Sequence, residues 1–339
     1  MSLNKITKQI SGTEKEAENN GRISIFSRFK LTTELTLLVI IVFIFIVMTV
    51  VTPNFMTTYN IGNLFKQASV IGIISIAATL VIISGGIDLS VGSLAGLVAM
   101  LVSVMISGNY MAKPILPAIL ITTVAGIVIG IYHGFIIHEI KLPPFIATLG
   151  SMIILRGIVK WISQARTIAN LPESFTTFAK LSLFNSIPSL VLVWLAAILI
   201  IHIVLTRTTF GRNIYVIGSS QEVARLSGIR MRLNIYGIYI LAAFLCTIAG
   251  ILMTSRLSSA IPTGGSGYEL TAIASAVIGG ASLSGAQGSV IGTMMGTILM
   301  VMIVNAGVHL SINPFIMEIV QGALLTVAVV IDMLRQRRS

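Results

Sequence analysis

Long apolar runs, separated by short polar breaks that contain proline or glycine, fill the sequence after residue 34. Most runs have roughly 17 to 25 residues, the length at which a helix crosses the ~30 Å hydrocarbon core of a bilayer. Within each run the apolar residues are continuous and do not alternate with polar ones, which disfavours a membrane β-barrel. The pattern predicts an all-α polytopic membrane protein.

The breaks divide the chain into about ten predicted transmembrane helices. They cover residues 35–51, 61–83, 89–106, 113–137, 143–161, 188–205, 233–253, 269–282, 289–309 and 314–333. Polar, irregular residues 162–186 separate the fifth helix from the sixth. Residues 254–268 are expected to form a loop outside the membrane, before a short eighth helix.

Basic residues gather in three polar segments, the leader 1–34, the loop 206–233 and the tail 335–339. Lys and Arg that flank membrane helices are retained on the cytoplasmic side during insertion. Ten crossings place all three segments on that side, so both termini are expected to be cytoplasmic. Residues 35–334 then form the transmembrane domain, and the polar leader is expected to be partly disordered.

Composition supports the membrane interpretation. Of the 339 residues, 55% are hydrophobic and 10% charged, whereas soluble domains have about 25% charged residues. The mean hydropathy is +0.98. We interpret the net charge of +11 as a topology signal, and expect no nucleic acid partner. The lone Cys246 excludes an internal disulfide and is expected to be a buried apolar residue.

Glycines four residues apart predict close helix packing, because small residues let helix backbones approach each other in lipid. The pairs are Gly92 and Gly96, Gly126 and Gly130, and Gly288 and Gly292. A short internal echo aligns residues 85–90 with residues 279–284, and each stretch precedes such a glycine pair. Transporters are often built from repeats with interrupted helices, so this echo suggests an internal repeat.

The sequence offers no catalytic constellation. No phosphate-binding GxxxxGK[ST] loop is present, so the chain is not expected to hydrolyse ATP. The histidines lack metal-ligand spacing, and we expect no bound metal. We therefore expect neither catalytic residues nor a resident cofactor.

A few polar residues within the apolar runs are informative, since a charge in lipid costs roughly 2.5–3.5 kcal/mol. Asp88 either caps the third helix or meets a substrate. Arg156 and Lys160, one turn apart, are expected to extend to the membrane interface. Two spans carry a further polar group near their outer ends, Asn305, His309, Glu318 and Gln321. This group suits a neutral polyhydroxylated solute, and the alternative is ordinary hydrogen bonding between helices.

Several blocks, ordered along most of the chain, resemble the membrane permease subunits of bacterial ribose-type sugar ABC importers. They are residues 85–93 (GGIDLSVGS), 144–150 (PFIATLG), 155–157 (LRG), 209–212 (TFGR), 224–229 (ARLSGI), 256–260 (RLSSA) with Pro262 and Thr263, and 267–270 (GYEL). The resemblance implies a multi-pass permease of the bacterial cytoplasmic (inner) membrane that moves a small neutral sugar inward. It also implies that this subunit is not an enzyme.

The resemblance further implies the partners. They are a second permease copy or a sister permease, cytoplasmic ATPase subunits that use ATP and Mg, an extracytoplasmic sugar-binding protein, and membrane lipid. The residues that would meet the ATPase are Gln221, Glu222, Ala224, Arg225, Leu226 and Gly228. The candidates for the translocation path are Asp88, Ser90, Phe145, Thr148, Asn305, Glu318 and Gln321.

Ribose is the first choice of cargo, and the alternatives are another pentose, a hexose, a furanosyl signalling molecule or a nucleoside. Two positions depart from the family pattern. Members often carry an acidic residue where this chain has Thr271, and a basic residue where it has Gln287. This double loss of charge indicates either the loss of one ion pair or a change of substrate. The alternative function outside the class of ABC importers is that of an ion-coupled secondary transporter.

Overall fold

The computed structural model describes residues 33–183 and 187–336. Most of the predicted leader 1–34 and the last three residues of the predicted tail 335–339 lie outside this range. The helices are α2 (Thr33–Val51), α3 (Thr58–Ile83), α4 (Val91–Ile106), α5 (Ile115–His138), α6 (Pro144–Ser163), α7 (Glu173–Thr176), η2 (Thr177–Lys180), α8 (Ser189–Arg207), α9 (Thr209–Ser219), α10 (Gln221–Leu226), α11 (Met231–Leu257), α12 (Tyr268–Ile278), α13 (Val290–His309) and α14 (Pro314–Gln336). Two short strands, β1 (Ser182–Leu183) and β2 (Ile187–Pro188), pair antiparallel.

Each predicted membrane segment contains a helix, and the all-α polytopic fold is confirmed. Among the described residues, eight helices are long and apolar enough to cross a membrane. The helices in the other two predicted membrane segments, α4 and α12, are shorter, with 16 and 11 residues. A helix rises 1.5 Å per residue, so α12 covers only about 17 Å of a ~30 Å hydrocarbon core. The eighth segment is therefore a partial span.

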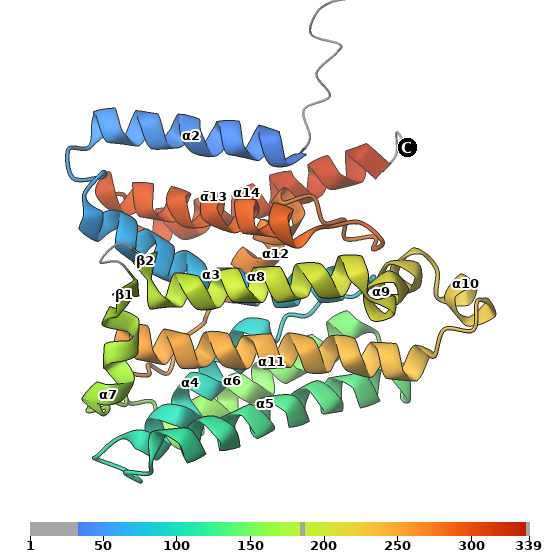
Figure 1. Ribbon diagram of the computed structural model, residues 1–339, viewed down its shortest axis with the longest axis horizontal. Coiled ribbons are helices and arrows are strands. Elements are labelled where there is room, and N and C mark those ends of the chain that lie inside the picture. Colours follow the sequence, from blue (N-terminus) through green and yellow to red (C-terminus); the bar gives the residue numbers. More distant parts are fainter. Residues whose placement is uncertain (1–32, 184–186, 337–339) are drawn as a thin grey trace, which may run out of the picture.

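Helix α3 forms the centre of the bundle. All of its residues from Ala68 to Ile83 are buried, and it packs against α11, α12, α13 and α8. A helix that is apolar on every side needs such surroundings, whereas an amphipathic helix needs cover on one face only. Helices α2 and α14 bury little surface, and α2 lies at the edge of the bundle (Figure 1).

The described chain begins and ends at the same end of the bundle. The first turn of α2, the last turn of α14 and helix α10 all lie at the right in Figure 1, while α7 and the β1–β2 hairpin lie at the left. A chain that crosses the bundle an even number of times begins and ends on the same side. The arrangement agrees with a basic loop and both termini on one side of the membrane.

The polar segment 206–233, expected as a loop, contains two helices, α9 and α10. Thr208 is the N-cap of α9, and its hydroxyl accepts the N–H of Gly211 (3.1 Å). Ser220 is the N-cap of α10, and its hydroxyl accepts the N–H of Val223 (3.3 Å). Both caps satisfy donors that a helix N-terminus leaves free, which explains the break between the helices.

The chain turns in the same way after α3 and after α12. In each turn the second residue past the helix donates its N–H to the carbonyl three residues back, and the next residue donates to the carbonyl five residues back. The donor and acceptor pairs are Gly85 and Ile82, Gly86 and Val81, Gly280 and Val277, and Ala281 and Ala276, all at 2.9–3.0 Å. Gly85 and Gly280 hold φ of +82° and +94°, where glycine carries no Cβ penalty.

These two turns explain the internal echo in the sequence. Gly85 matches Gly280 in hydrogen bonding and in φ, so the turns align one residue away from the sequence echo, which matched Gly85 with Gly279. The same pair of hydrogen bonds ends α10, where Gly228 has φ of +75°. The echo therefore coincides with a shared helix-capping motif, and a repeat of a larger unit stays a prediction.

The glycines of α5 lie in a close contact with a neighbouring helix. A Cβ added at Gly126 would meet the side chain of Thr247 on α11, and one at Gly130 would meet the backbone of Ile240 at 2.8 Å. On α13, a Cβ at Gly292 would meet the carbonyl of Gly279.

The other glycines expected in helix packing have different surroundings. Gly92 and Gly96 of α4 lie against residues 264–269, where a loop and the start of α12 enter the bundle. Gly288 precedes α13 and has φ of +146°, so it belongs to a turn. Residues 264 and 265 are buried against α4, so this part of the predicted loop 254–268 packs into the bundle; its position relative to the membrane stays a prediction.

Candidate functional site

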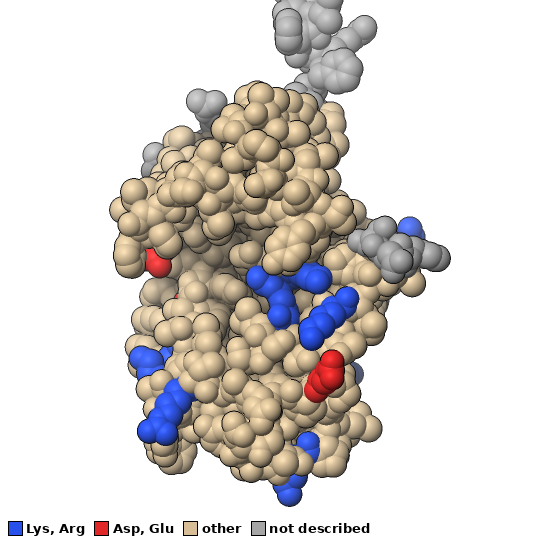
Figure 2. All heavy atoms as spheres, turned by 90° about the vertical axis from the view of Figure 1, so that its left-hand side faces the viewer, with Lys and Arg blue, Asp and Glu red and all other residues tan. Residues whose placement is uncertain are grey.

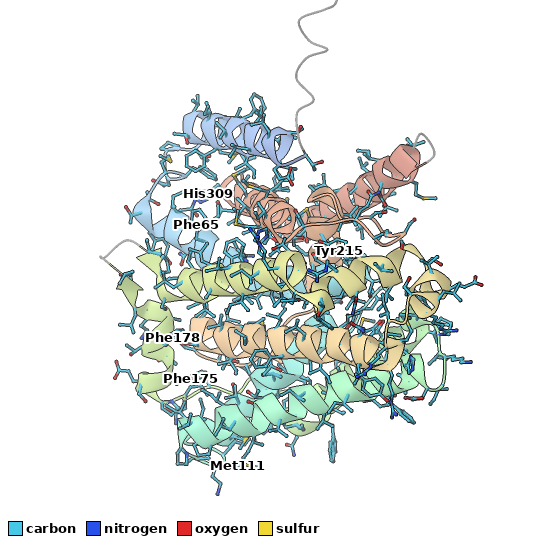
Figure 3. The ribbon with its side chains drawn as sticks, turned by 45° about the vertical axis from the view of Figure 1, so that its right-hand side comes forward. Phe65, Met111, Phe175, Phe178, Tyr215 and His309 are labelled. Carbon is cyan, nitrogen blue, oxygen red and sulfur yellow. The ribbon has the colours of Figure 1, made fainter. Side chains whose placement is uncertain are left out.

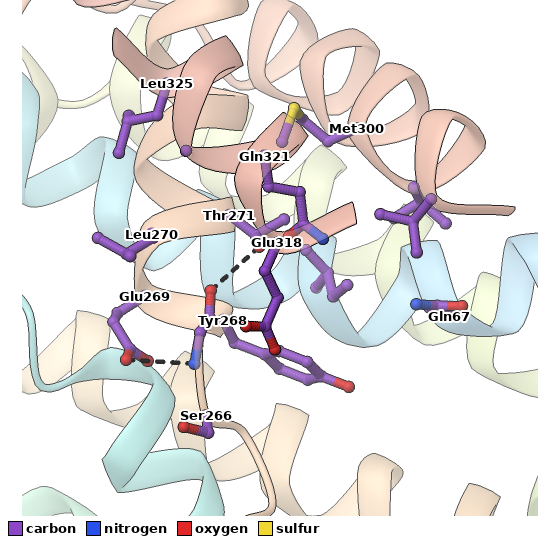
Figure 4. A pocket seen from close by; sticks show the side chains of 15 residues that line it. Gln67, Ser266, Tyr268, Glu269, Leu270, Thr271, Met300, Glu318, Gln321 and Leu325 are labelled. Carbon is purple, nitrogen blue, oxygen red and sulfur yellow. Dashed lines mark hydrogen bonds between the residues drawn. The ribbon is translucent and has the colours of Figure 1, made fainter. Parts of the chain in front are cut away.

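A cavity of about 560 Å³ lies between α3, α12, α13 and α14. Apolar side chains from α3, α13 and α14 form part of its wall, and the polar side chains gather around the start of α12 and on α14 (Figure 4). The polar lining residues are Gln67, Ser266, Tyr268, Glu269, Thr271, Glu318 and Gln321. A volume of this size, with a few converging polar groups in an apolar wall, is typical of a small-ligand site.

Thr271 connects the two helices that carry most of the polar lining. Its hydroxyl lies 3.0 Å from the carbonyl of Gly267 and 3.3 Å from the Gln321 side-chain oxygen (Figure 4). Gln287, the other position that departs from the family pattern, follows the far end of α12. About 10 Å of helix separates the two positions, which does not favour the loss of one direct ion pair. Thr271 instead belongs to the cavity.

An ion pair lies beside the cavity. The Arg156 Nη2 and Glu269 Oε2 atoms are 3.7 Å apart, with side chains 16% and 12% exposed. Arg156 also donates from Nη1 to the carbonyl of Gly264 (2.6 Å). The expectation that Arg156 extends to the membrane interface is wrong, because residues 264–269 provide oxygen partners inside the bundle. Lys160, one turn later, is exposed.

The polar group expected on α13 and α14 divides in two. Glu318 and Gln321 line the cavity, whereas Asn305 and His309 do not. Asn305 and Asn60 exchange two side-chain hydrogen bonds, of 2.8 and 3.1 Å. The ring of His309 packs edge-on against Phe55, with centroids 5.6 Å apart. Asn305 therefore links α13 to α3, as the alternative interpretation allowed, while His309 packs against the segment between α2 and α3.

Asp88 supports the turn that leads into α4. Its Oδ1 atom accepts the backbone N–H of Ser90 (2.7 Å) and the Ser90 hydroxyl (2.6 Å). Thr148, from α6, accepts the N–H of Leu89 (3.2 Å) and thereby holds the same segment. Phe145 is 48% exposed on the surface of α6. None of the candidates Asp88, Ser90, Phe145 and Thr148 lines the cavity, and their place in a translocation path stays a prediction.

The α10 helix presents a compact exposed surface at one end of the bundle. Gln221, Glu222, Arg225, Leu226 and Gly228 are all exposed. Leu226 is 83% exposed, an unusual state for a large apolar side chain.

Ala224 differs from these neighbours because it is fully buried and belongs to the hydrophobic core. It can position α10, but it cannot contact a partner directly.

The opposite end of the bundle has a different surface. Figure 2 shows Lys and Arg side chains gathered near its middle, beside a recess. Within residues 33–183 and 187–336, no group of three His, Cys, Asp or Glu side chains could hold a metal ion.

Several cavity residues were not singled out from the sequence. Tyr268 and Glu269 lie in a block that resembles the family, but Tyr268 was assigned to the loop 254–268 and Glu269 to the start of a short helix, so neither was expected at a cavity. Gln67 is a polar residue in a long apolar run, and that signal could have identified it.

Half-helices that end inside a bundle, beside a polar cavity, are typical of membrane transporters. The chain belongs to the family described as "Branched-chain amino acid transport system / permease component", which matches residues 60–329. It is therefore a transport component and not an enzyme, and it is a multi-pass protein of the bacterial cytoplasmic membrane.

Curated relatives confirm the resemblance to ribose-type permeases. The chain is 37% identical to the ribose import permease protein RbsC of Bacillus subtilis, over 85% of this chain and 88% of the relative. It is 34% identical to the galactose/methyl galactoside import permease protein MglC of Escherichia coli K12, over 85% and 90%. It is 33% identical to the RbsC protein of that strain, over 92% and 97%. No solved structure matches the chain.

Proposed function

We propose that this chain is the membrane permease subunit of an ABC importer and carries a small neutral sugar, ribose, into the cell. The observation that carries the proposal is the cavity beside α12, whose polar lining is rich in amide, hydroxyl and carboxylate groups. Such groups can donate to and accept from sugar hydroxyls, and Tyr268 adds an aromatic ring. The printed names of the relatives include ribose and galactose import.

The α10 surface supports the proposal of a separate ATPase partner. Leu226 and Val223 are exposed apolar residues at the tip of a short helix, with Glu222 and Arg225 beside them. An apolar contact with a charged rim is typical of a protein interface. We expect the partner to use ATP and Mg, while this chain holds no cofactor. A sugar-binding protein would deliver cargo at the opposite end, and a second permease would complete the pathway.

Uptake by reconstituted proteoliposomes tests the proposal. The permease is co-reconstituted with the proposed ATPase and sugar-binding protein partners, and uptake of labelled ribose is measured with ATP inside. We expect ATP-dependent uptake that unlabelled ribose suppresses and that a hydrolysis-deficient ATPase abolishes. ATP-dependent uptake of labelled galactose, a second pentose or a nucleoside, with no uptake of labelled ribose, would reassign the cargo.

The same preparation distinguishes the ion-coupled alternative. Uptake by the permease alone, driven by a proton or sodium gradient, would refute the importer proposal. A gradient without ATP is expected to give no uptake. Gradient-driven uptake would thus change the proposed transport mechanism, and the family assignment would stay the same.

A further inference from the structure

Three backbone segments that are far apart in the sequence meet at Gly218. A Cβ added to Gly218 would meet the carbonyl oxygen of Ile83, at the end of α3, and would lie 2.7 Å from the backbone nitrogen of Ala286. From the other side, a Cβ at Gly285 would lie 2.5 Å from the Gly218 carbonyl, and the ideal Cβ of Gly85 lies 3.7 Å from it. The end of α9 thus touches the turn after α3 and the turn after α12 at once.

The two turns are also joined to each other. Ala286 donates its N–H to the carbonyl of Ile83 (2.9 Å). At these backbone contacts no flexible side chain lies between the segments to absorb a displacement. Close-packed interiors transmit strain, so the segments are expected to move together. A movement of either turn is therefore passed to the other turn and to α9.

Tyr215 supplies a second link from α9, one turn before Gly218. Its hydroxyl donates to the carbonyl of Gly288 in the turn before α13 (2.9 Å), and its side chain points from α9 into the bundle (Figure 3). Burial raises the pKa of the Tyr215 hydroxyl, so the donor stays protonated at neutral pH. Helix α9 is thus held to the second turn at two points.

Three of the four helices that these turns join, α3, α12 and α13, line the cavity. The turn after α3 leads into α4, whose Gly92 and Gly96 lie against residues 264–269. The other turn joins α12, which starts at the cavity, to α13, which carries Met300 in its wall. On the other side, only Ser219 separates Gly218 from Ser220, the cap of α10.

We propose that Gly218 is the positioning residue that couples movement of α10 to both helix-breaking turns, and through them to the cavity. This inference rests on the proposed function, because α10 is taken there as the surface that meets the ATPase. The absence of a side chain at Gly218 lets α9 stay in backbone contact with both turns.

The test is the number of ATP molecules hydrolysed per sugar taken up, measured in the reconstituted importer. Gly218→Ala inserts a methyl group against the Ile83 carbonyl and leaves the α10 surface unchanged. We expect ATPase binding and hydrolysis within about twofold of the unmodified importer and sugar uptake lowered at least tenfold. Gly62→Ala is the matched control, since a Cβ there meets no heavy atom within 4 Å. It is expected to leave the ratio unchanged.

Tyr215→Phe keeps the inference testable if Gly218→Ala does not assemble. It removes one hydrogen bond and preserves the ring, and we expect the ATP-to-sugar ratio to rise about threefold. An unchanged ratio in an assembled Gly218→Ala variant overturns the inference. If that variant does not assemble, an unchanged ratio in Tyr215→Phe overturns it. Absence of ATP-driven uptake by the unmodified importer would instead refute the proposed function.

Discussion

The Arg156 Nη2 atom on α6 and the Glu269 Oε2 atom on α12 face each other at 3.7 Å beside the cavity, and neither has a hydrogen-bond partner in the described part of the chain. Each charge depends on the other because little solvent reaches either side chain. The pair connects α6 to the start of α12, the element that carries Tyr268 and Thr271 into the cavity.

Glu269→Gln is expected to lower the apparent melting temperature of the detergent-purified protein. The substitution leaves Arg156 without its countercharge, which costs about 1–3 kcal/mol, less than for a fully buried pair because both side chains are slightly exposed. The double variant Arg156→Met with Glu269→Gln is expected to recover part of the loss. Lys160→Met, on the exposed face of α6, is the control. Equal melting temperatures for Glu269→Gln and the unmodified protein would contradict the pairing.

Gln321→Leu is expected to weaken cargo recognition. The loss of one neutral hydrogen bond to a sugar hydroxyl costs about 0.5–1.5 kcal/mol, which corresponds to a roughly 2- to 10-fold higher KM for uptake. Thr326→Val, on the exposed side of α14, is the matched control. An unchanged KM would place the sugar elsewhere in the bundle.

Asn305→Leu is expected to act on stability and not on recognition. Asn60 would lose its reciprocal partner, at a cost of about 1 kcal/mol, as is usual for polar contacts between membrane helices. The apparent melting temperature should fall while the KM stays unchanged, which is the opposite of the result expected for Gln321→Leu. A raised KM with unchanged stability would return Asn305 to the translocation path.

Two substitutions distinguish a structural role of Asp88 in the turn before α4 from a direct contact with cargo. Asp88→Asn keeps an oxygen that accepts from Ser90 and removes the charge, whereas Asp88→Ala removes both bonds. If Asp88 only supports the turn, Asp88→Ala should destabilise the protein by about 1.5–3 kcal/mol and Asp88→Asn by less, with uptake retained in Asp88→Asn. Loss of uptake in a stable Asp88→Asn variant would indicate contact with cargo.

Leu226→Asp is expected to abolish co-purification of the ATPase subunit while the permease remains folded. The side chain is 83% exposed, so the substitution places a charge in the proposed apolar contact without disturbing the core. Leu181→Asp makes the same change at a residue that is 55% exposed, in the segment that precedes β1, and should leave ATPase binding intact. Retention of the ATPase by Leu226→Asp would exclude α10 as the main contact.

The sequence by itself determined the membrane class, the approximate positions of the spans and the family. These features depend on local properties, since the length of an apolar run, a cap residue or a turn glycine acts within a few neighbouring residues. The start of α10 at Gln221 and its end before Gly228 follow from such signals. Glu318 and Gln321 were also identified in this way, as polar residues in apolar runs.

Only the tertiary structure decided which polar residues meet. Residues 264–267 form a loop, as their small side chains after a proline predict, but the missing side chains at Gly92 and Gly96 let the backbone of residues 264 and 265 pack inside the bundle. That entry turns Arg156 inward and brings Glu269 and Thr271 to the cavity. Asn305 and Gln321 are both polar residues in apolar spans, yet Asn305 pairs with Asn60 and Gln321 lines the cavity. Such pairings depend on close contact between backbone segments that are far apart in the sequence, and no local sequence pattern encodes that contact.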